Sequence, residues 1–401
     1  MSSRFPGGLD KPNIYPAVTG TGTTRWTGMW TLTDAANALV AGNWASSPIW
    51  GSGYNSNGGG LGLGDTTARS SLTAVGGGMI PWTDISSGAR GCLALRQDGT
   101  LWAWGTNPYG ALGDSTIIAK SSPIQVGALT TWAKIAMDTY TSFAIKSNGT
   151  LWSWGYNMVG QLGDSTVYST NRSSPVQVGA LTNWSAVFCG SSTIMAVKSD
   201  GTLWGWGRNT SGQLGIGNTT NYSSPKQVGA LTTWSKVTID SNRTLALKTD
   251  GTLWAWGSGS GGTLGDGTTV SKSSPIQIGA LTTWTATGKM GAIKGGELWH
   301  WGYVASGRLA IGGSIATNYS SPVQVGVQTN WSSLSTGGGS TNFGTAIKTD
   351  GTLWGWGANQ YGALGTDNTT TPAKIPTQIS NLTTWIKTTN QGYASVHLKT
   401  V

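Results

Sequence analysis

The sequence has few of the residues that most catalytic, metal and disulfide sites use. Its 401 residues include two cysteines and two histidines, and charged residues make up only 10% of the chain. No stretch approaches the 18 or more apolar residues that a membrane-spanning helix needs. The first residues, Met-Ser-Ser-Arg-Phe-Pro-Gly-Gly, contain no apolar core of a signal peptide. We therefore expect neither a membrane span nor a signal peptide.

The residues that are abundant, 63 glycines and 23 tryptophans, recur at a fixed spacing. The motif Leu-Trp-x-Trp-Gly occurs six times, and its second tryptophan falls at positions 104, 154, 206, 256, 301 and 356. A period of about fifty residues is typical of one supersecondary unit stacked on copies of itself, as in a propeller or a solenoid.

One copy of the repeat shows how the unit is built. Two strand-like runs, 143–147 and 150–155, flank Asn148-Gly149, which predicts a hairpin with a type I′ turn. The two tryptophans of the motif lie two residues apart, so both point to one face, where we expect them to contact the neighbouring unit. The later Ser173-Ser-Pro-Val-Gln-Val segment contains a proline, which confines its strand to an edge or a strand start. Each unit therefore reads as four short strands, a propeller blade.

The number of blades follows from the tryptophan that opens each copy: Trp82, Trp132, Trp184, Trp234, Trp284, Trp331 and Trp385. The copy that starts at Trp385 stops after 396–400, before its second hairpin strand, and a matching Ser-Pro-Ile-Trp-Gly stands at 47–51. We therefore predict an all-β, seven-bladed propeller over residues 47–401, whose last blade pairs an N-terminal strand with C-terminal strands. Such closure removes free sheet edges.

The pattern Gly-Thr-Leu-Trp-x-Trp-Gly-x-Asn-x-x-Gly-Gln-Leu-Gly, followed by Ser-Ser-Pro-x-Gln-Val-Gly, resembles the repeat of the regulator-of-chromosome-condensation (RCC1-like) family. Residues 201–229 carry it almost completely, and the resemblance covers 47–401. It implies a seven-bladed propeller with this kind of closure. Functions in that family range from nucleotide exchange on a small GTPase to inhibition of β-lactamases and other binding roles, and every matched motif is scaffold. The resemblance thus implies a fold and assigns no active residue.

The net charge of +9 suggests nucleic acid as a partner, but the repeat argues against it. Basic residues recur at one repeat position, at Arg96, Lys146, Lys198, Lys248, Lys294, Lys348 and Lys399, and no basic run occurs. A nucleic-acid site clusters its cations and interleaves them with aromatics. All tryptophans outside the first 46 residues also have a place in the repeat, so a tryptophan-lined ligand site is not expected.

Catalysis, cofactors and metals find no support in the residue pattern. His300 and His397 lie in blade strands without a third histidine, and we interpret them as satisfied blade residues. Asp65, Asp114, Asp164 and Asp266 each follow Leu-Gly, one per blade, and are expected to be turn residues that bond their own backbone. Cys92 and Cys189 are not at equivalent positions, so we expect two buried free thiols. The protein is therefore predicted to be no enzyme, with no cofactor and no metal site.

Recognition is the remaining role for the loops. The residue that ends the variable loop before Ser-Ser-Pro or its equivalent is Arg69, Lys120, Arg172, Tyr222, Lys272 or Tyr319, and the loop after the double tryptophan adds Tyr109, Tyr303 and Tyr361. If the blades superpose, the first set forms a ring at one end, and arginine and tyrosine are frequent in binding hot spots. The alternative is that these side chains only solvate the rim. The irregular spacings after Trp284 and Trp331 are open to the same two interpretations, a partner site or tolerated loop variation.

Residues 1–46 precede the repeats and form a candidate attachment or oligomerisation arm. Residues 33–42 read as a short helix with Thr33 as N-cap and Gly42 after its end, and Trp26, Trp30 and Trp44 form an aromatic cluster around it. The stretch 28–44 is similar to short segments of tailed-phage virion and tail-fibre proteins. The alternative is an arm that only packs on the propeller.

These observations lead to a functional hypothesis with two alternatives. We expect a non-enzymatic tailed-phage virion protein, part of a tail fibre, baseplate or capsid surface. Its arm would bind other virion proteins or trimerise, and its loops would contact a host-surface receptor or glycan. The second option is a soluble protein-binding module or enzyme inhibitor of the bacterial cytoplasm, and the third is a GTPase exchange factor.

Overall fold

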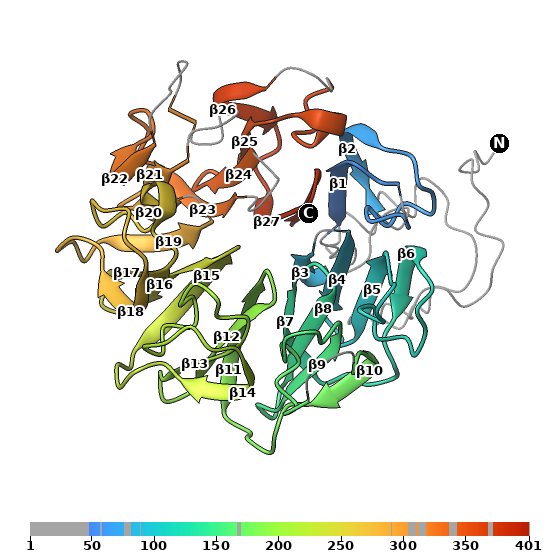
Figure 1. Cartoon of the computed structure of the whole chain (residues 1–401). Coiled ribbons are helices and arrows are strands. Elements are labelled where there is room, and N and C mark those ends of the chain that lie inside the picture. The colour runs from blue at the N-terminus through green and yellow to red at the C-terminus, as the bar shows by residue number, and fades with distance from the viewer. Residues whose placement is uncertain are drawn as a thin grey trace, which may run out of the picture.

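The fold is a ring of seven four-stranded sheets around a central axis (Figure 1). The computed structural model describes residues 48–56, 58–75, 82–88, 90–166, 170–289, 291–303, 310–311, 318–336, 343–367 and 372–400. Within these residues every regular element is a strand, apart from the short 3₁₀ turns η2 (Ser260–Gly262) and η4 (Gln360–Gly362). The predicted all-β, seven-bladed propeller is confirmed. The arm, with its expected helix and Trp26, Trp30 and Trp44, lies outside the described residues.

Each blade has four antiparallel strands, numbered outward from the axis. The innermost strands are β3 (Trp82–Ser87), β7 (Trp132–Met137), β11 (Trp184–Gly190), β15 (Trp234–Asp240), β19 (Trp284–Gly288), β23 (Trp331–Thr336) and β27 (Trp385–Gln391). The second strands are β4 (Gly91–Arg96), β8 (Thr141–Lys146), β12 (Thr193–Lys198), β16 (Arg243–Lys248), β20 (Gly291–Lys294), β24 (Phe343–Lys348) and β28 (Ala394–Lys399).

The outer half of each blade contains the double-tryptophan strand and an edge strand. The third strands are β5 (Leu101–Gly105), β9 (Leu151–Gly155), β13 (Leu203–Gly207), β17 (Leu253–Gly257), β21 (Glu297–Gly302), β25 (Leu353–Gly357) and β1 (Ile49–Gly53). The outermost are β6 (Lys120–Gln125), β10 (Arg172–Gln177), β14 (Tyr222–Gln227), β18 (Lys272–Gln277), β22 (Tyr319–Gln324), β26 (Ala373–Ser380) and β2 (Arg69–Ala74). The prolines of the Ser-Ser-Pro segments all lie in these outermost strands, as their missing N–H requires.

The hairpin between the second and third strands forms where predicted, but the predicted type I′ turn is wrong in the regular blades. In blade 1, Gly99 has φ +75° while Asp98 does not have a positive φ. A type I′ turn needs positive φ at both central residues. The Gly99 N–H instead donates to the Arg96 carbonyl, and the Arg96 N–H donates to the Thr100 carbonyl. This is a longer loop that closes with one left-handed glycine.

Blade 5 alone among these hairpins has the two-residue turn. Gly295 and Gly296 both have positive φ, +54° and +84°, and the flanking Lys294 and Glu297 pair directly. The shorter turn accounts for part of the reduced spacing between Trp284 and Trp301. The expected insertion at 337–341 in blade 6 lies outside the described residues.

The hydrophobic core lies between blades. In the third strand of blade 3, Trp206 is fully buried, and its indole Nε1 donates to the Gln161 carbonyl of blade 2 at 3.0 Å. A Cβ on Gly163 would stand 2.6 Å from that same nitrogen. The second tryptophan therefore packs against the preceding blade, as predicted, and the glycine after Leu162 is needed to let the backbone approach the ring.

The last blade closes the ring with strands from both chain ends, in the order β2-β1-β28-β27. Its third strand has Ser52 where other blades have the second tryptophan. Ser52 and Ser395 both donate toward the Ala363 carbonyl of blade 6, the role that the indole N–H has elsewhere. The predicted pairing of N-terminal and C-terminal strands is confirmed, with two strands from each end.

Candidate functional site

The loops between third and fourth strands, here called the excursions, form one end of the propeller. A buried asparagine organises each regular excursion. The Asn157 Oδ1 accepts from the Leu162 N–H at 3.1 Å, and its Nδ2 donates to the Thr166 hydroxyl at 2.9 Å. Asn55, Asn107, Asn209 and Asn359 accept from the equivalent leucine or from Leu61 in the same way. The excursions are therefore rigid platforms.

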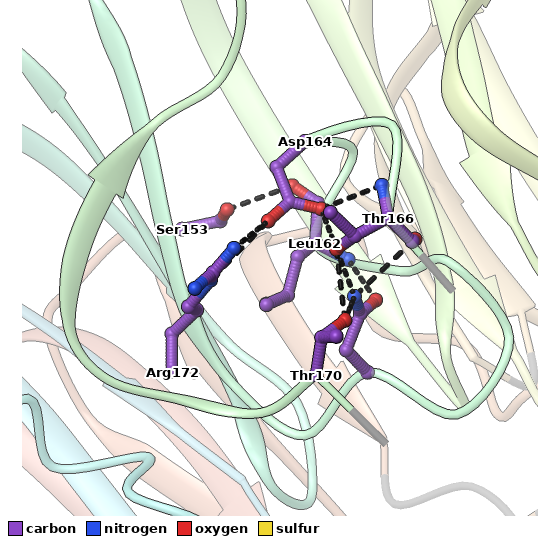
Figure 2. Close-up of polar contacts among 7 residues, drawn as sticks. Ser153, Leu162, Asp164, Thr166, Thr170 and Arg172 are labelled. Carbon is purple, nitrogen blue, oxygen red and sulfur yellow. Dashed lines mark hydrogen bonds and ion pairs between the residues drawn. The ribbon is translucent and has the colours of Figure 1, made fainter. Parts of the chain in front are cut away.

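The aspartates after Leu-Gly are turn residues, as predicted. In Figure 2, Asp164 lies between Thr166 and Arg172. Its Oδ1 accepts from the Thr166 N–H at 3.0 Å, and Asp65, Asp114 and Asp266 accept from Thr67, Thr116 and Thr268 in the same manner. The hydrogen bond from Thr67, followed by that from Arg69, lowers the pKa of Asp65.

The same aspartates neutralise the cations of the predicted recognition ring. The ring residues do share one register position, each opposite the final glycine of the Trp-x-Trp-Gly strand or its equivalent, such as Arg172 opposite Gly155. Each cation, however, forms an ion pair within its own blade: Arg69–Asp65 at 2.5 Å, Lys120–Asp114 at 3.5 Å, Arg172–Asp164 at 3.4 Å and Lys272–Asp266 at 3.9 Å. These cations hold the first residue of the edge strand to the excursion.

The two tyrosines of the ring also have partners within the molecule. The Tyr222 hydroxyl accepts from Asn218 at 3.2 Å, and Tyr319 packs against the core cluster that contains Trp284 and Trp301. The ring is therefore brought together as predicted, but its members stabilise the blades.

The tyrosines of the loop after the double tryptophan lie at seams between blades. Tyr109 of blade 1 packs against Tyr140 and Tyr156 of blade 2, with ring centroids 5.1 and 4.6 Å apart. Tyr361 of blade 6 packs against Tyr54 and Tyr393 of blade 7, at 5.0 and 5.7 Å. We call these groups the Tyr109 and Tyr361 clusters.

Tyr303 lies at the seam between blades 4 and 5, with its hydroxyl 2.9 Å from the Ser260 hydroxyl. Tyr303 and Tyr361 are 42% and 48% exposed. Large aliphatic side chains of the excursions, Ile117, Ile118 and Val270, are exposed by 59–67%. The excursion end thus combines a rigid framework with exposed apolar and aromatic side chains that differ from blade to blade.

The opposite end, which carries the hairpin turns and the loops between blades, is more uniform. It exposes a leucine three residues before the opening tryptophan of most blades: Leu129, Leu181, Leu231, Leu281 and Leu382. Here the repeated cations lie over tryptophan rings, as with Lys198 Nζ 3.7 Å from the Trp204 centroid. The predicted scaffold role of these basic residues is confirmed, since a cation over an indole face is attracted to it.

A central channel of about 590 Å³ runs along the innermost strands. Its lining includes three aspartates and three lysines, Asp84, Asp138, Asp240, Lys134, Lys289 and Lys387. Lys387 pairs with Asp84 across the seam of blades 7 and 1, and Asp138 accepts from the Ser192 N–H at 2.6 Å. The charges of both signs leave no single-sign field for a charged ligand.

The rare residues predicted to be inert are structural. His397 is fully buried, with Nδ1 2.9 Å from the Thr388 hydroxyl and Nε2 2.9 Å from the Ser395 hydroxyl, and burial lowers its pKa to about 3. Both cysteines are free. Cys92 is buried as expected, but Cys189 is only half-buried because it lines the channel; burial raises the pKa of both thiols.

Two searches of the described residues returned nothing. They contain no group of three or more histidine, cysteine or acidic side chains arranged to hold a metal ion. No helix in this part of the chain is long and apolar enough to cross a membrane.

Sequence reasoning missed the partners that complete the clusters and the channel. Tyr140 and Tyr393 lie in turns between first and second strands, and Tyr54 and Tyr156 follow a third strand. Equivalent repeat positions were the available signal, because the chain has tyrosine at the same three places at two seams. The charges of the channel gave no signal, since facing strands are about fifty residues apart.

Comparison with known families identifies the repeat. The family described as regulator of chromosome condensation (RCC1) repeat matches residues 98–145, 148–197, 200–247, 250–287 and 350–389, more than half of the chain. A second family of the same description matches 82–111 and 184–213. The chain belongs to the RCC1 repeat family. The matches to this RCC1-repeat protein leave out residues 288–349, where blade 5 has its shorter hairpin.

Individual relatives agree on the fold. The chain is 28% identical over 175 residues to the ultraviolet-B receptor UVR8 of Arabidopsis thaliana, which covers 42% of this chain and 39% of that protein. The chain thus matches well under half of the length of this curated relative. Yeast RCC1 (Prp20) bound to Kap60 has a TM-score of 0.76 at 19% identity over 89% of both chains. Human WBSCR16 has a TM-score of 0.77 at 18% identity, over 88% of this chain and 99% of the other.

Proposed function

We propose that this RCC1-repeat protein is a non-enzymatic recognition protein whose excursion end binds its partner. The observation that carries the proposal is the contrast at that end. Its cations are paired within their own blades, while Ile117, Ile118, Tyr303 and Tyr361 are exposed on excursions held by buried asparagines. Exposed apolar and aromatic side chains on rigid loops are typical of binding surfaces.

The finer proposal is a structural protein of a tailed-phage virion, with the virion as its location. Its support comes from the sequence: the segment 28–44 is similar to tailed-phage virion proteins, and the 46 residues before the ring are long enough to attach the propeller. In this proposal the arm binds other virion proteins, and the excursion end faces a host-surface receptor or glycan.

The test is mass spectrometry of purified virions, combined with deletion of residues 1–43. We expect the chain in intact virions, and a shortened chain that still folds, since the described ring starts at residue 48, but no longer assembles. Absence of the chain from purified virions would exclude the virion proposal.

Protein-binding roles without a virion remain the second candidate. Structures of the yeast fold neighbour Prp20 concern its binding to Kap60, Gsp1p and histones, which favours a protein partner for this fold. A shortened chain that retains a soluble bacterial partner would support a binding module or inhibitor. Acceleration of nucleotide release from a small GTPase would support an exchange factor.

A further inference from the structure

A pocket lies at the excursion end, at the seam where the ring closes. Its volume is about 440 Å³, within the range of ~300–1,000 Å³ typical of small-ligand sites. Ala68 and Ser70 line it from the start of β2, and Gln360 and Tyr361 line it from η4. We propose that this pocket is a subsite for a neutral carbohydrate, with the Tyr361 ring as the surface on which a sugar ring stacks.

The Tyr361 ring is held in place by the closing blade. Tyr54, which follows β1, and Tyr393, in the turn between β27 and β28, both meet it edge-on, at interplanar angles of 64° and 62°. The Tyr54 N–H donates to the Tyr393 carbonyl at 3.0 Å, which fixes the two supporting rings to each other. Tyr361 therefore keeps one orientation although it is 48% exposed.

The backbone of Tyr361 is unusual for a bulky residue. Its φ is +60° and its ψ is 15°, the left-handed region that side chains with a Cβ rarely occupy. Blade 4 has Gly261 at the equivalent position, with φ +67°. A tyrosine held where glycine would be free of strain indicates that the ring has a use beyond the fold.

The lining chemistry favours an uncharged, hydroxyl-rich ligand. The Gln360 amide and the Ser70 hydroxyl can each donate and accept hydrogen bonds, as hydroxyl groups on the edge of a sugar require. The exposed ring of Tyr361 offers an apolar face to the C–H groups of the sugar. The cation that begins β2, Arg69, is paired with Asp65, so the pocket has no free cation for a phosphate or carboxylate among its four lining residues.

The chain contains a matched control. The Tyr109 cluster has tyrosines at the same three repeat positions, at the seam between blades 1 and 2. Among the pockets found in the described residues, the one at a tyrosine cluster is lined by Tyr361. A role in packing alone would therefore apply to both clusters, whereas the proposed ligand site belongs to the Tyr361 cluster.

The inference rests on the proposed recognition role of the excursion end, and its test requires no virion. The purified full chain is mixed with glucose, galactose, mannose, rhamnose, N-acetylglucosamine and short oligomers of each, and binding is read by saturation-transfer NMR. Glucuronate and inorganic phosphate serve as charged comparators. We expect transfer to the ring C–H protons of at least one neutral sugar and none to phosphate.

The variants separate stacking from folding. Tyr361→Gly removes the ring and suits the left-handed backbone, so it should fold and weaken binding by roughly tenfold or more. Tyr361→Phe keeps the ring and should bind within a few-fold, and Tyr109→Ala should bind like the parent. If Tyr361→Gly loses the native circular dichroism signal, Gln360→Ala replaces it, with several-fold weaker binding expected.

Three outcomes would overturn the subsite: no transfer to any neutral sugar, unchanged binding in Tyr361→Gly, or equal loss in Tyr109→Ala. Preferential binding of phosphate or of glucuronate would also contradict it. Sugar binding by a chain that is absent from virions would refute the virion role and leave the subsite intact, and the converse result would do the opposite.

Discussion

At the scale of single residues, the ring depends on contacts between one indole nitrogen and the backbone of the preceding blade. Trp104, Trp154, Trp206, Trp256 and Trp301 each donate through Nε1 to a carbonyl of the previous excursion, at 2.8–3.0 Å. A buried carbonyl left without its donor costs about 1–3 kcal/mol. The motif is therefore a set of joints between blades.

A glycine substitution tests one joint. In Gly163→Ala the new Cβ would stand 2.6 Å from Trp206 Nε1, at a φ of +72°. We expect the free energy of unfolding to fall by about 2–4 kcal/mol, since backbone strain adds to the disrupted hydrogen bond. Gly179→Ala is the control, because Gly179 has φ +61° and no atom within 4 Å of a Cβ. Equal urea midpoints for the two variants would show that the indole contact contributes nothing.

His397 gives the closing blade an acid-sensitive residue. Its pKa falls from 6.5 to about 3 because the ring is buried, so the folded state keeps it neutral while the unfolded state binds a proton below pH 6.5. Its contribution is therefore complete above pH 6.5 and is lost as the pH falls toward 3. The full change is of order 5 kcal/mol at 1.36 kcal/mol for each pH unit.

A neutral replacement tests this sign. We expect His397→Gln to be less stable than the parent at pH 7 but to lose less stability between pH 7 and pH 4, since glutamine does not titrate. Urea unfolding at four pH values measures both slopes. Parallel slopes would contradict the assignment of the acid sensitivity to His397.

At the scale of elements, the hairpin between second and third strands is a relay of polar contacts. In blade 1 the Asp98 carboxylate accepts from the Thr100 N–H and hydroxyl, at 3.1 and 2.6 Å. The Trp102 indole donates to that hydroxyl at 2.9 Å, and Arg96 lies over the Trp102 ring. The turn type that the sequence suggested was wrong because these side-chain bonds stabilise a loop with a single left-handed residue.

Substitution of Asp98 distinguishes its hydrogen bonds from its charge. Asp98→Ala should cost about 1 kcal/mol through the lost bonds to Thr100. Asp98→Asn should be nearly neutral at pH 7, since Asn148 makes the same bonds in blade 2. Thermal unfolding of both variants provides the comparison. Equal destabilisation by Ala and Asn would mean that the charge, and not the acceptor geometry, stabilises the turn.

The pH dependence of Asp98 has the opposite origin to that of His397. Partial burial raises its pKa, but the hydrogen bonds from Thr100 outweigh this, and the net pKa lies below 3.8. Its stabilisation is therefore present above pH 4 and is lost as the pH falls below that value. The difference between the parent and Asp98→Asn should shift in favour of the variant in that range.

At the scale of the whole molecule, the ring is closed by backbone pairing between chain ends. Ile49 pairs with Leu398 and Gly53 with Ala394, and the buried Thr345, Thr388, His397, Ser395 and Ser52 form a hydrogen-bonded chain across the last seam. Closure leaves no unpaired inner strand.

Removal of the last strand should open the ring. We expect a chain that ends at Tyr393, without β28, to unfold over a broad temperature range and to aggregate, because β1 and β27 then present free edges. The matched control is deletion of residues 1–43 at the other end, which should leave the midpoint within about 2 °C of the parent. Differential scanning calorimetry and light scattering measure both; a sharp, unshifted transition without β28 would show that closure is dispensable.

The sequence by itself determined the repeat, the strand order within each blade, the number of blades and the pairing of the two chain ends. These follow from local spacing, since the alternation of Leu-Trp-x-Trp-Gly, the glycine turns and the edge prolines restricts each segment to one kind of strand. The tertiary structure alone decided what the loop residues do. Arg172 finds Asp164 eight residues away, and Tyr361 meets Tyr54 across the closed ring. Such contacts depend on distances that are set only when the blades pack around the axis, and no local pattern encodes them.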